Sequence, residues 1–177
     1  QGPAAPNGTA VLEVFASCSR LTGACADLGF CVAAPIDIAN GEHHDVHSPR
    51  TQRAILDWVR GGLLWAIWLA IPCTADSIAT AGKKPSEVLQ QQRGRLFAFL
   101  IKLVRTANES GVFIVVENPL SSRLWRNRGL CRALAEAGCE DFDYDTCAFG
   151  SSYRKPQRLR SNVTQLSSVR SRCSCTL

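Results

Sequence analysis

Apolar segments of strand length alternate along the chain with segments whose apolar residues keep helical spacing. The segment Leu63–Ile71 is apolar on both faces, as expected for a strand that helices cover on both sides of a parallel sheet. Strands are predicted at Val11–Phe15, Cys31–Ile36, Leu63–Ile71 and Val112–Val116, with further strands at Phe142–Ala148 and Leu159–Val163. Helices are predicted at Leu21–Leu28, Arg53–Val59, Glu87–Ala107 and Leu130–Ala137.

This alternation predicts an α/β protein with three layers, in which helices cover a mostly parallel sheet. A length of 177 residues suits one domain. We expect residues 1–10 to be a flexible lead-in, residues 11–163 to form the domain, and residues 164–177 to be a basic tail or the start of a continuation. The sequence contains no Met, which indicates a piece of a longer protein.

Reactive or polar side chains stand where the predicted strands end. They are the turn Ser17–Ser19, Asp37, Cys73 and Glu117. In sheets of this kind the carboxyl ends of the strands share one edge, and ligands bind beyond that edge. The sequence therefore predicts a ligand site built from these residues.

Each of these side chains allows a functional and a structural interpretation. Asp37 can accept hydrogen bonds from a ribose diol, or it can cap a loop. Cys73 can attack an electrophilic carbon if its thiol pKa is lowered, or it can be an inert buried thiol. Glu117 can hold or protonate a ring nitrogen of a base, or it can form a salt bridge, for example with Arg93.

The net charge of +5 is concentrated near the C-terminus. No acidic residue follows Asp145, whereas Arg154, Lys155, Arg158, Arg160, Arg170 and Arg172 are basic. Such a segment can bind phosphates, including a DNA or RNA backbone, or it can serve only as a solubilising tail.

The cysteines, the apolar runs and the histidines indicate the cellular compartment and bear on membrane and metal binding. The nine cysteines are odd in number and include no Cys-x2-Cys pair, which favours a reducing, intracellular compartment. The longest apolar run, Leu63–Pro72, is too short to span a bilayer, so no membrane partner is expected. His43, His44 and His47 with Asp45 match no common metal spacing, and a solvated loop without metal is the better interpretation.

Taken together, these segments resemble the catalytic part of the cytosine-5 DNA methyltransferase family. Ile71-Pro72-Cys73 with Ser77 resembles the Pro-Cys nucleophile loop. The segment Arg93–Phe97 is similar to the Arg-Gly-x-Leu-Phe segment, and Val116-Glu117-Asn118 to the Glu-Asn-Val motif.

The same resemblance continues on both sides of these motifs. Pro156–Arg160 is similar to the Gln-x-Arg-x-Arg motif, one residue shorter between Gln and the last Arg. Leu12–Ala16 resembles the strand and Phe that open the cofactor site, and Asp37 falls at the position of the ribose-binding acid. The matches occur in the family's order over about residues 11–163.

The resemblance implies a Rossmann-like S-adenosylmethionine-dependent methyltransferase fold and a DNA-methylating function, nuclear if the source is a eukaryote. It implies a cofactor site at Phe15, Ser17, Ser19 and Asp37. It further implies that Cys73 adds to C6 of cytosine and that Glu117 contacts N3 and the amino group. Arg158 or Arg160 would support the base and the flipped backbone, because the base must leave the stack to react.

Two other function classes remain open from the sequence. The chain can be a non-catalytic nucleic-acid-binding or interaction module that retains the fold. It can also be an unrelated cysteine hydrolase, although the three histidines cluster in one loop and offer no convincing partner for Cys73.

Overall fold

A computed structural model describes residues 7–72 and 86–173 of the chain. The strands are β1 (Ala10–Val14), β2 (Leu64–Ala70), β3 (Phe113–Pro119), β4 (Glu140–Asp145) and β5 (Pro156–Ser161). The α-helices are α1 (Arg20–Asp27), α2 (Pro49–Arg60), α3 (Glu87–Glu109) and α4 (Arg128–Glu136). Short 3-10 helices are η1 (Ile38–Asn40), η2 (Glu42–His44), η4 (Arg123–Arg126), η5 (Thr146–Phe149) and η6 (Thr164–Val169).

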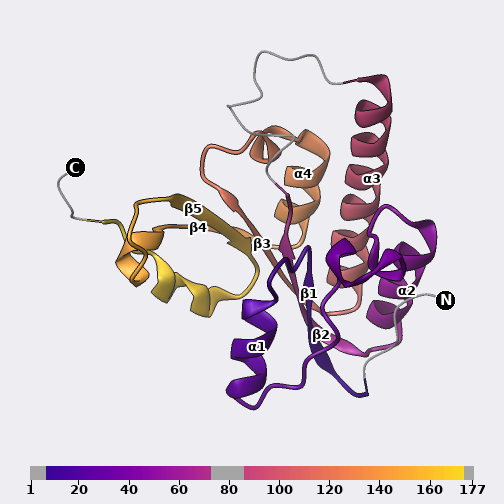
Figure 1. Cartoon of the computed structure of the whole chain (residues 1–177), viewed down its shortest axis with the longest axis horizontal. Helices are drawn as coiled ribbons and strands as arrows, with labels where there is room; N and C mark the ends of the chain where they lie inside the picture. Colours follow the sequence, from indigo (N-terminus) through magenta and orange to yellow (C-terminus); the bar gives the residue numbers. More distant parts are fainter. Residues whose placement is uncertain (1–6, 73–85, 174–177) are drawn as a thin grey trace.

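The strands form one mixed sheet of order β1-β2-β3-β5-β4, which confirms the predicted α/β class (Figure 1). The strands β1, β2 and β3 pair in parallel, whereas β5 is antiparallel to both of its neighbours. The prediction of a mostly parallel sheet therefore holds for the β1-β2-β3 half and not for the pairing around β5. The connection 146–155 contains no α-helix that would cross the sheet, so β4 and β5 pair as antiparallel neighbours.

The predicted strand Cys31–Ile36 is not a continuous strand. It meets β1 only through two isolated parallel bridges, at Val32 and at Ile36. The Ala33 amide donates to the Val11 carbonyl, but the next donor to β1 is Ile36, which bonds to the Glu13 carbonyl. Pro35 has no N–H, so it cannot donate at the position where a regular ladder needs it, and the pairing is interrupted there.

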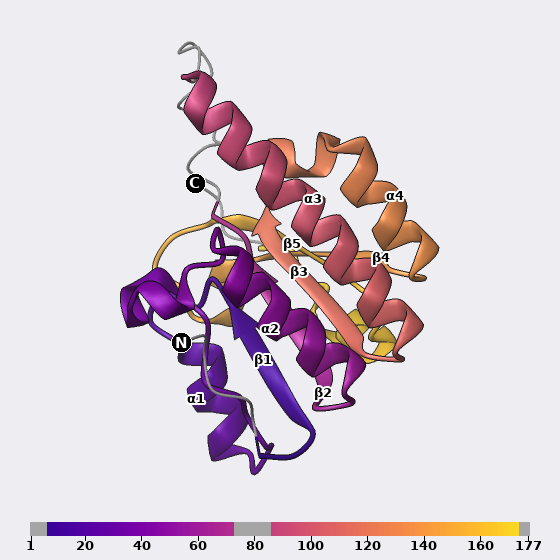
Figure 2. The ribbon, with the colours of Figure 1, turned by 90° about the vertical axis from the view of Figure 1, so that its right-hand side faces the viewer.

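The larger apolar core lies between the sheet and the helices α2, α3 and α4, which lie side by side on one face (Figure 2). We call this the first face of the sheet. Its fully buried members include Leu12, Ile55, Ile67, Leu100, Leu130 and Val116. Ser48 caps α2, its hydroxyl accepting from the Arg50 amide, and Pro49 opens the helix, so α2 begins four residues before the predicted Arg53.

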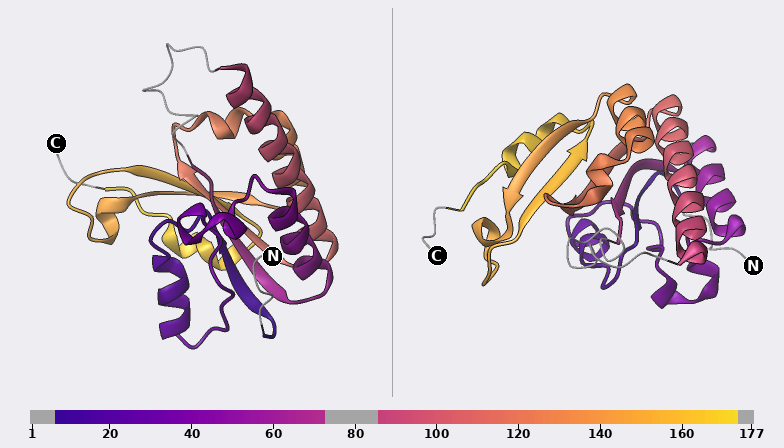
Figure 3. Two further views of the ribbon diagram at one scale, coloured as in Figure 1. Left: turned by 45° about the vertical axis from the view of Figure 1, so that its right-hand side comes forward. Right: turned by 90° about the horizontal axis from the view of Figure 1, so that it is seen from above.

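The second face is covered by α1 and η6 instead. A small core of Val115, Phe142 and Leu159 packs there against Leu166 and Val169 of η6. Helix α1 is tied to this face because the amide and hydroxyl of Thr22 both donate to the buried carboxylate of Glu13. The β4–β5 hairpin extends outward, away from α2 and α3 (Figure 3). Among the helices in the described residues, none combines the length and the apolar character that a bilayer span requires.

Candidate functional site

The turn after β1 is held in an unusual backbone conformation. Phe15, Ser17 and Ser19 all have left-handed φ angles, of 61°, 46° and 53°. Residues with a side chain adopt this region rarely and at a cost of roughly 1–2 kcal/mol each. The surrounding structure must therefore impose the turn.

Asp37 is the group that fixes this turn. Its Oδ2 accepts a hydrogen bond from the Ser17 amide at 2.8 Å, and its Oδ1 accepts one from the Ala39 amide at 2.9 Å. A carboxylate oxygen has room for a second hydrogen bond, so the half-buried Asp37 keeps acceptor capacity for a ligand. The structure thus brings together the predicted residues Ser17 and Asp37, with Ser19 at the start of α1 and Phe15 packed against the larger core.

This turn lies where the chain direction across the sheet changes. After β1 the chain passes through α1 on the second face toward Cys31–Ile36, on the outer side of β1. After β2 it passes through α3 on the first face toward β3, on the other side. The carboxyl ends of β1 and β2 therefore flank a topological switch point, which is where open α/β sheets bind ligands.

Cys73 lies outside the described residues, but the strand that leads to it is well placed. Ala70, the last residue of β2, pairs with Glu117 of β3. The buried Asn118 side chain donates its amide to the carbonyl of Ile71, which fixes the chain one residue beyond β2. Ala70 and Ile71, close before Cys73 in the sequence, therefore lie beside the end of β3 that carries Glu117.

Glu117 stands on the second face near the end of β3. Burial raises the pKa of its carboxyl group, and the nearby Lys155 ammonium acts in the opposite direction. Tyr144 of β4 lies on the same face, and burial together with the charge of Glu117 raises the pKa of its phenol to about 12. A carboxyl group with a raised pKa is suited to donate a proton to a ring nitrogen near neutral pH.

Gln157 is a site residue whose individual role the sequence did not indicate. It pairs with Pro119 of β3 and with Tyr144 of β4, so it shares the second face with Glu117. The residue is only 5% exposed, and among the described residues its Oε1 atom finds no hydrogen-bond partner. A buried amide oxygen without a partner costs about 1–3 kcal/mol, which a ligand with an N–H donor would recover.

Arg158 and Arg160 lie on the other face of the sheet. Arg158 pairs with Asn118 and Arg160 with Val116, whereas Glu117 pairs with the intervening Leu159. The structure therefore does not bring these two predicted site residues together with Glu117.

Carboxylates of β4 hold both of these arginines on the first face. Arg158 binds Asp143 through two hydrogen bonds of 2.7 and 3.0 Å, and Arg160 binds Asp141 in the same bidentate way. Both guanidinium groups lie over the ring of Trp125, at 5.8 and 5.1 Å. Both guanidinium groups therefore have bidentate carboxylate partners and an aromatic ring to stack on within the protein.

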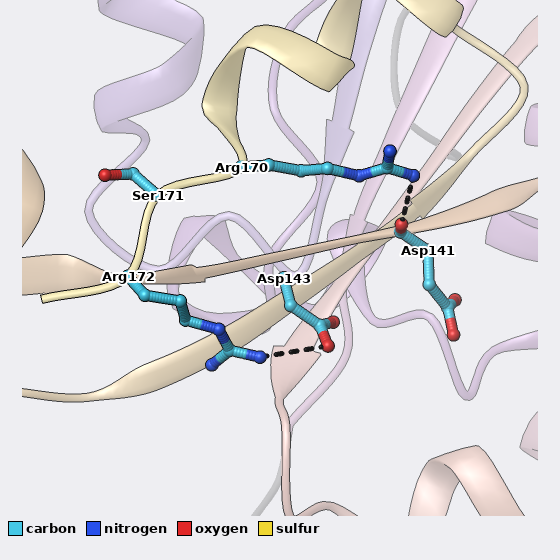
Figure 4. Close-up of a pocket in the computed structure, with 5 residues that line it drawn as sticks. All are labelled: Asp141, Asp143, Arg170, Ser171 and Arg172. Atoms are coloured by element: carbon cyan, nitrogen blue, oxygen red, sulfur yellow. Dashed lines mark hydrogen bonds and ion pairs between the residues drawn. The ribbon is translucent and has the colours of Figure 1, made fainter.

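The basic C-terminal segment is neutralised in the same way. Arg154 and Arg172 form ion pairs with Asp145, at 3.2 and 3.7 Å, and Arg172 also reaches Asp143 at 3.2 Å. Arg170 donates to the Asp141 carbonyl at 2.9 Å (Figure 4). Its guanidinium group also lies over the Phe142 ring.

Backbone bonds fasten this tail along β4. The Asp145 amide donates to the Ser171 carbonyl, and the Cys173 amide donates to the Asp145 carboxylate. That amide and the neighbouring arginines lower the pKa of Asp145. The signal for this arrangement was present in the sequence, since β4 reads Glu-Asp-Phe-Asp-Tyr-Asp, with an acid at every position that does not face the smaller core.

The histidine loop offers no metal centre. Within the described residues no group of three or more potential protein ligands comes together. His44 is buried, its ring lies 4.4 Å from that of His43, and burial lowers its pKa.

Comparison of the sequence with models of known protein families and with curated proteins finds no match. Inference about function therefore starts from the residues and their geometry.

Proposed function

We propose that the chain is the catalytic part of a DNA cytosine-5 methyltransferase that uses S-adenosylmethionine. The observation that carries the proposal is the edge formed by β1, β2 and β3. There the Ser17–Asp37 turn, the strand leading to Cys73, and Glu117 follow one another at neighbouring strand ends. Adjacent strands are about 4.8 Å apart, so the turn and Glu117 are separated by roughly 10 Å across β2.

The residues at the first of these strand ends fit a nucleoside cofactor. Asp37 has acceptor capacity left for a ribose diol, and its hydrogen bond to Ser17 holds the turn close to that position. When bound, S-adenosylmethionine would supply an electrophilic methyl group. Asp37 and the Ser17 turn would bind its ribose and hold its orientation relative to the edge of the sheet.

The residues at the third strand end fit an aminopyrimidine ring. Glu117 in its protonated form would donate to ring N3 and, through its other oxygen, accept from the amino group. The Gln157 carboxamide would supply a second acceptor for that amino group. Cys73 would form the S–C6 bond and C5 would take the methyl group. Transfer of the C5 proton to water would then break the S–C6 bond and release the thiolate.

The rival interpretation is a non-catalytic module that retains the fold. The side chains at the three left-handed positions of the turn favour it, because glycine would adopt that backbone without strain. The pairing of the C-terminal arginines with β4 counts against nucleic-acid binding through that segment.

Isothermal titration calorimetry with S-adenosylmethionine tests the cofactor part of the proposal. We expect saturable binding that Asp37→Ala weakens at least about tenfold, which corresponds to about 1.4 kcal/mol. The control variant is Asp57→Ala, which removes an exposed carboxylate of α2 that pairs with Arg60. Thermal unfolding of both variants shows that the fold is intact. Absence of saturation at millimolar cofactor would reject the proposal.

A further inference from the structure

Three arginines of η4 and of the start of α4 differ from the arginines of the C-terminal segment. Arg123, Arg126 and Arg128 are exposed. Carboxylates of β4 form ion pairs with Arg158 and Arg160 of β5 and with Arg154 and Arg172 of the C-terminal segment. In residues 7–72 and 86–173, by contrast, no acidic side chain forms an ion pair with Arg123, Arg126 or Arg128.

The three cations lie on two successive elements, η4 and α4. Arg123 and Arg126 are the first and last residues of η4. In a 3-10 helix, side chains three residues apart project in the same direction. Arg128 is the first residue of α4, whose first turn contains no acidic residue. The positive end of the helix dipole therefore adds to the charge of the arginines.

The segment that carries them is firmly anchored. Leu124 is 1% exposed, and the Ser122 hydroxyl accepts from its amide. The Trp125 indole N–H donates to the Pro119 carbonyl at 2.9 Å, which fixes η4 against the end of β3. On its other side Trp125 packs under the guanidinium groups of Arg158 and Arg160. Arg158 and Arg160 of β5 thus support η4, which carries Arg123 and Arg126.

The position of the segment relates it to Glu117. η4 begins four residues after β3 ends, at the same end of the molecule as the strand edge described above (Figure 2). A duplex whose target base enters at Glu117 would bring its backbone to this end of the molecule. Arginine is well suited to that contact, because its planar fork matches phosphate oxygens.

We propose that Arg123, Arg126 and Arg128 form a surface that binds the phosphodiester backbone of duplex DNA beside the Glu117 site. The choice of DNA as the partner rests on the proposed function. The arginines of the basic C-terminal segment, in contrast, form ion pairs with carboxylates of β4 and contribute little to this contact.

The test is fluorescence anisotropy with a labelled 24-base-pair duplex of mixed sequence, titrated from 50 to 200 mM salt without cofactor. Each phosphate contact adds about 0.9 to the slope of log K against log salt, so three contacts give a slope of about −2.7 and an affinity loss of about 40-fold over this range. We expect the triple variant Arg123→Gln, Arg126→Gln and Arg128→Gln to lose this contribution.

Two further variants control for net charge and for folding. The triple variant Arg60→Gln, Arg105→Gln and Arg132→Gln removes the same charge from exposed arginines that are each paired with an acid, and it should keep the wild-type slope. The triple Lys variant of positions 123, 126 and 128 should keep most of it.

The proposal is overturned if the Arg123–Arg126–Arg128 variant retains the wild-type slope, if the control triple loses as much, or if the duplex does not bind. A single-stranded RNA of equal length that binds more tightly would overturn the choice of partner. Failure of methyl transfer is distinguishable, because a chain that binds DNA through these arginines without methylating it retains this surface and refutes only the proposed activity.

Discussion

Glu117 and Arg158 lie on adjacent strands but on opposite faces of the sheet. Arg158 pairs with Asn118, and Glu117 pairs with Leu159, so the two charged side chains point away from each other. The candidate base site is therefore formed by the second face at the end of β3, where Glu117, Gln157 and Tyr144 gather. Arg158 and Arg160 lie on the first face, where they bind carboxylates of β4 and stack on Trp125.

Arg160→Ala is expected to reduce stability. Arg160 is 17% exposed, binds Asp141 through two hydrogen bonds, and stacks on Trp125, so its loss leaves a partly buried carboxylate less well paired. We expect the free energy of unfolding to fall by about 2 kcal/mol in urea titrations. Arg132→Ala, which breaks an exposed pair with Glu136, should cost less than about 0.5 kcal/mol. Equal losses in the two variants would contradict this assignment.

The stability of the chain should depend on pH through Glu117. Because burial raises the pKa of this carboxyl above its ordinary value of 4.5, the folded state holds the proton more tightly than the unfolded state. Its contribution to stability is therefore present below pH 4.5 and is lost as the pH rises through the higher folded-state pKa.

Glu117→Gln removes this dependence. Urea titration at successive pH values gives the free energy of unfolding of the wild type and of this variant. As the pH rises, the wild type should become less stable relative to the variant. Lys155→Gln should extend the effect to higher pH, since the Lys155 ammonium lowers the pKa of Glu117. A difference that is constant with pH would show that Glu117 has no raised pKa.

Gln157→Leu should separate stability from ligand recognition. The buried Oε1 atom has no partner in the part of the chain that the structure describes. Replacing the amide by an apolar group of similar size therefore removes a desolvation cost and should stabilise the free protein by up to about 1 kcal/mol. The same change should weaken capture of cytosine in DNA. Gln165→Leu, at an exposed position of η6, is the matched control and should leave capture unchanged. A clear loss of stability in the Gln157 variant would mean that its amide is satisfied in solution.

The alternation of strands and helices could be predicted because long periodic segments carry the signal themselves. Four α-helices, the strands β1, β2 and β3, and the polar residues that end them follow from local pattern. The interruption at Pro35 depended on which residue must donate to β1, and this is set by register with a strand distant in sequence.

The roles of the arginines depended on non-local pairing. Gln157-Arg158-Leu159-Arg160 alternates with a period of two, so it could be predicted that Gln157 and the two arginines face opposite ways. The sequence could not show that β5 inserts between β3 and β4. Pairing of β5 with β4 places Asp141 and Asp143 beside the two arginines, so both guanidinium groups form ion pairs within the fold.

The proposed function requires that Cys73 and Glu117 act together on cytosine. The most direct measurement is denaturing gel electrophoresis after incubation of the chain with S-adenosylmethionine and a mixed-sequence duplex in which one strand carries 5-fluorocytosine. We expect a covalent protein–DNA band that Cys73→Ser abolishes and Glu117→Gln strongly reduces. The control variant Cys18→Ser, at an exposed free thiol, should retain the band. A wild-type chain that forms no such band, or a Cys73→Ser variant that still forms it, would contradict the account.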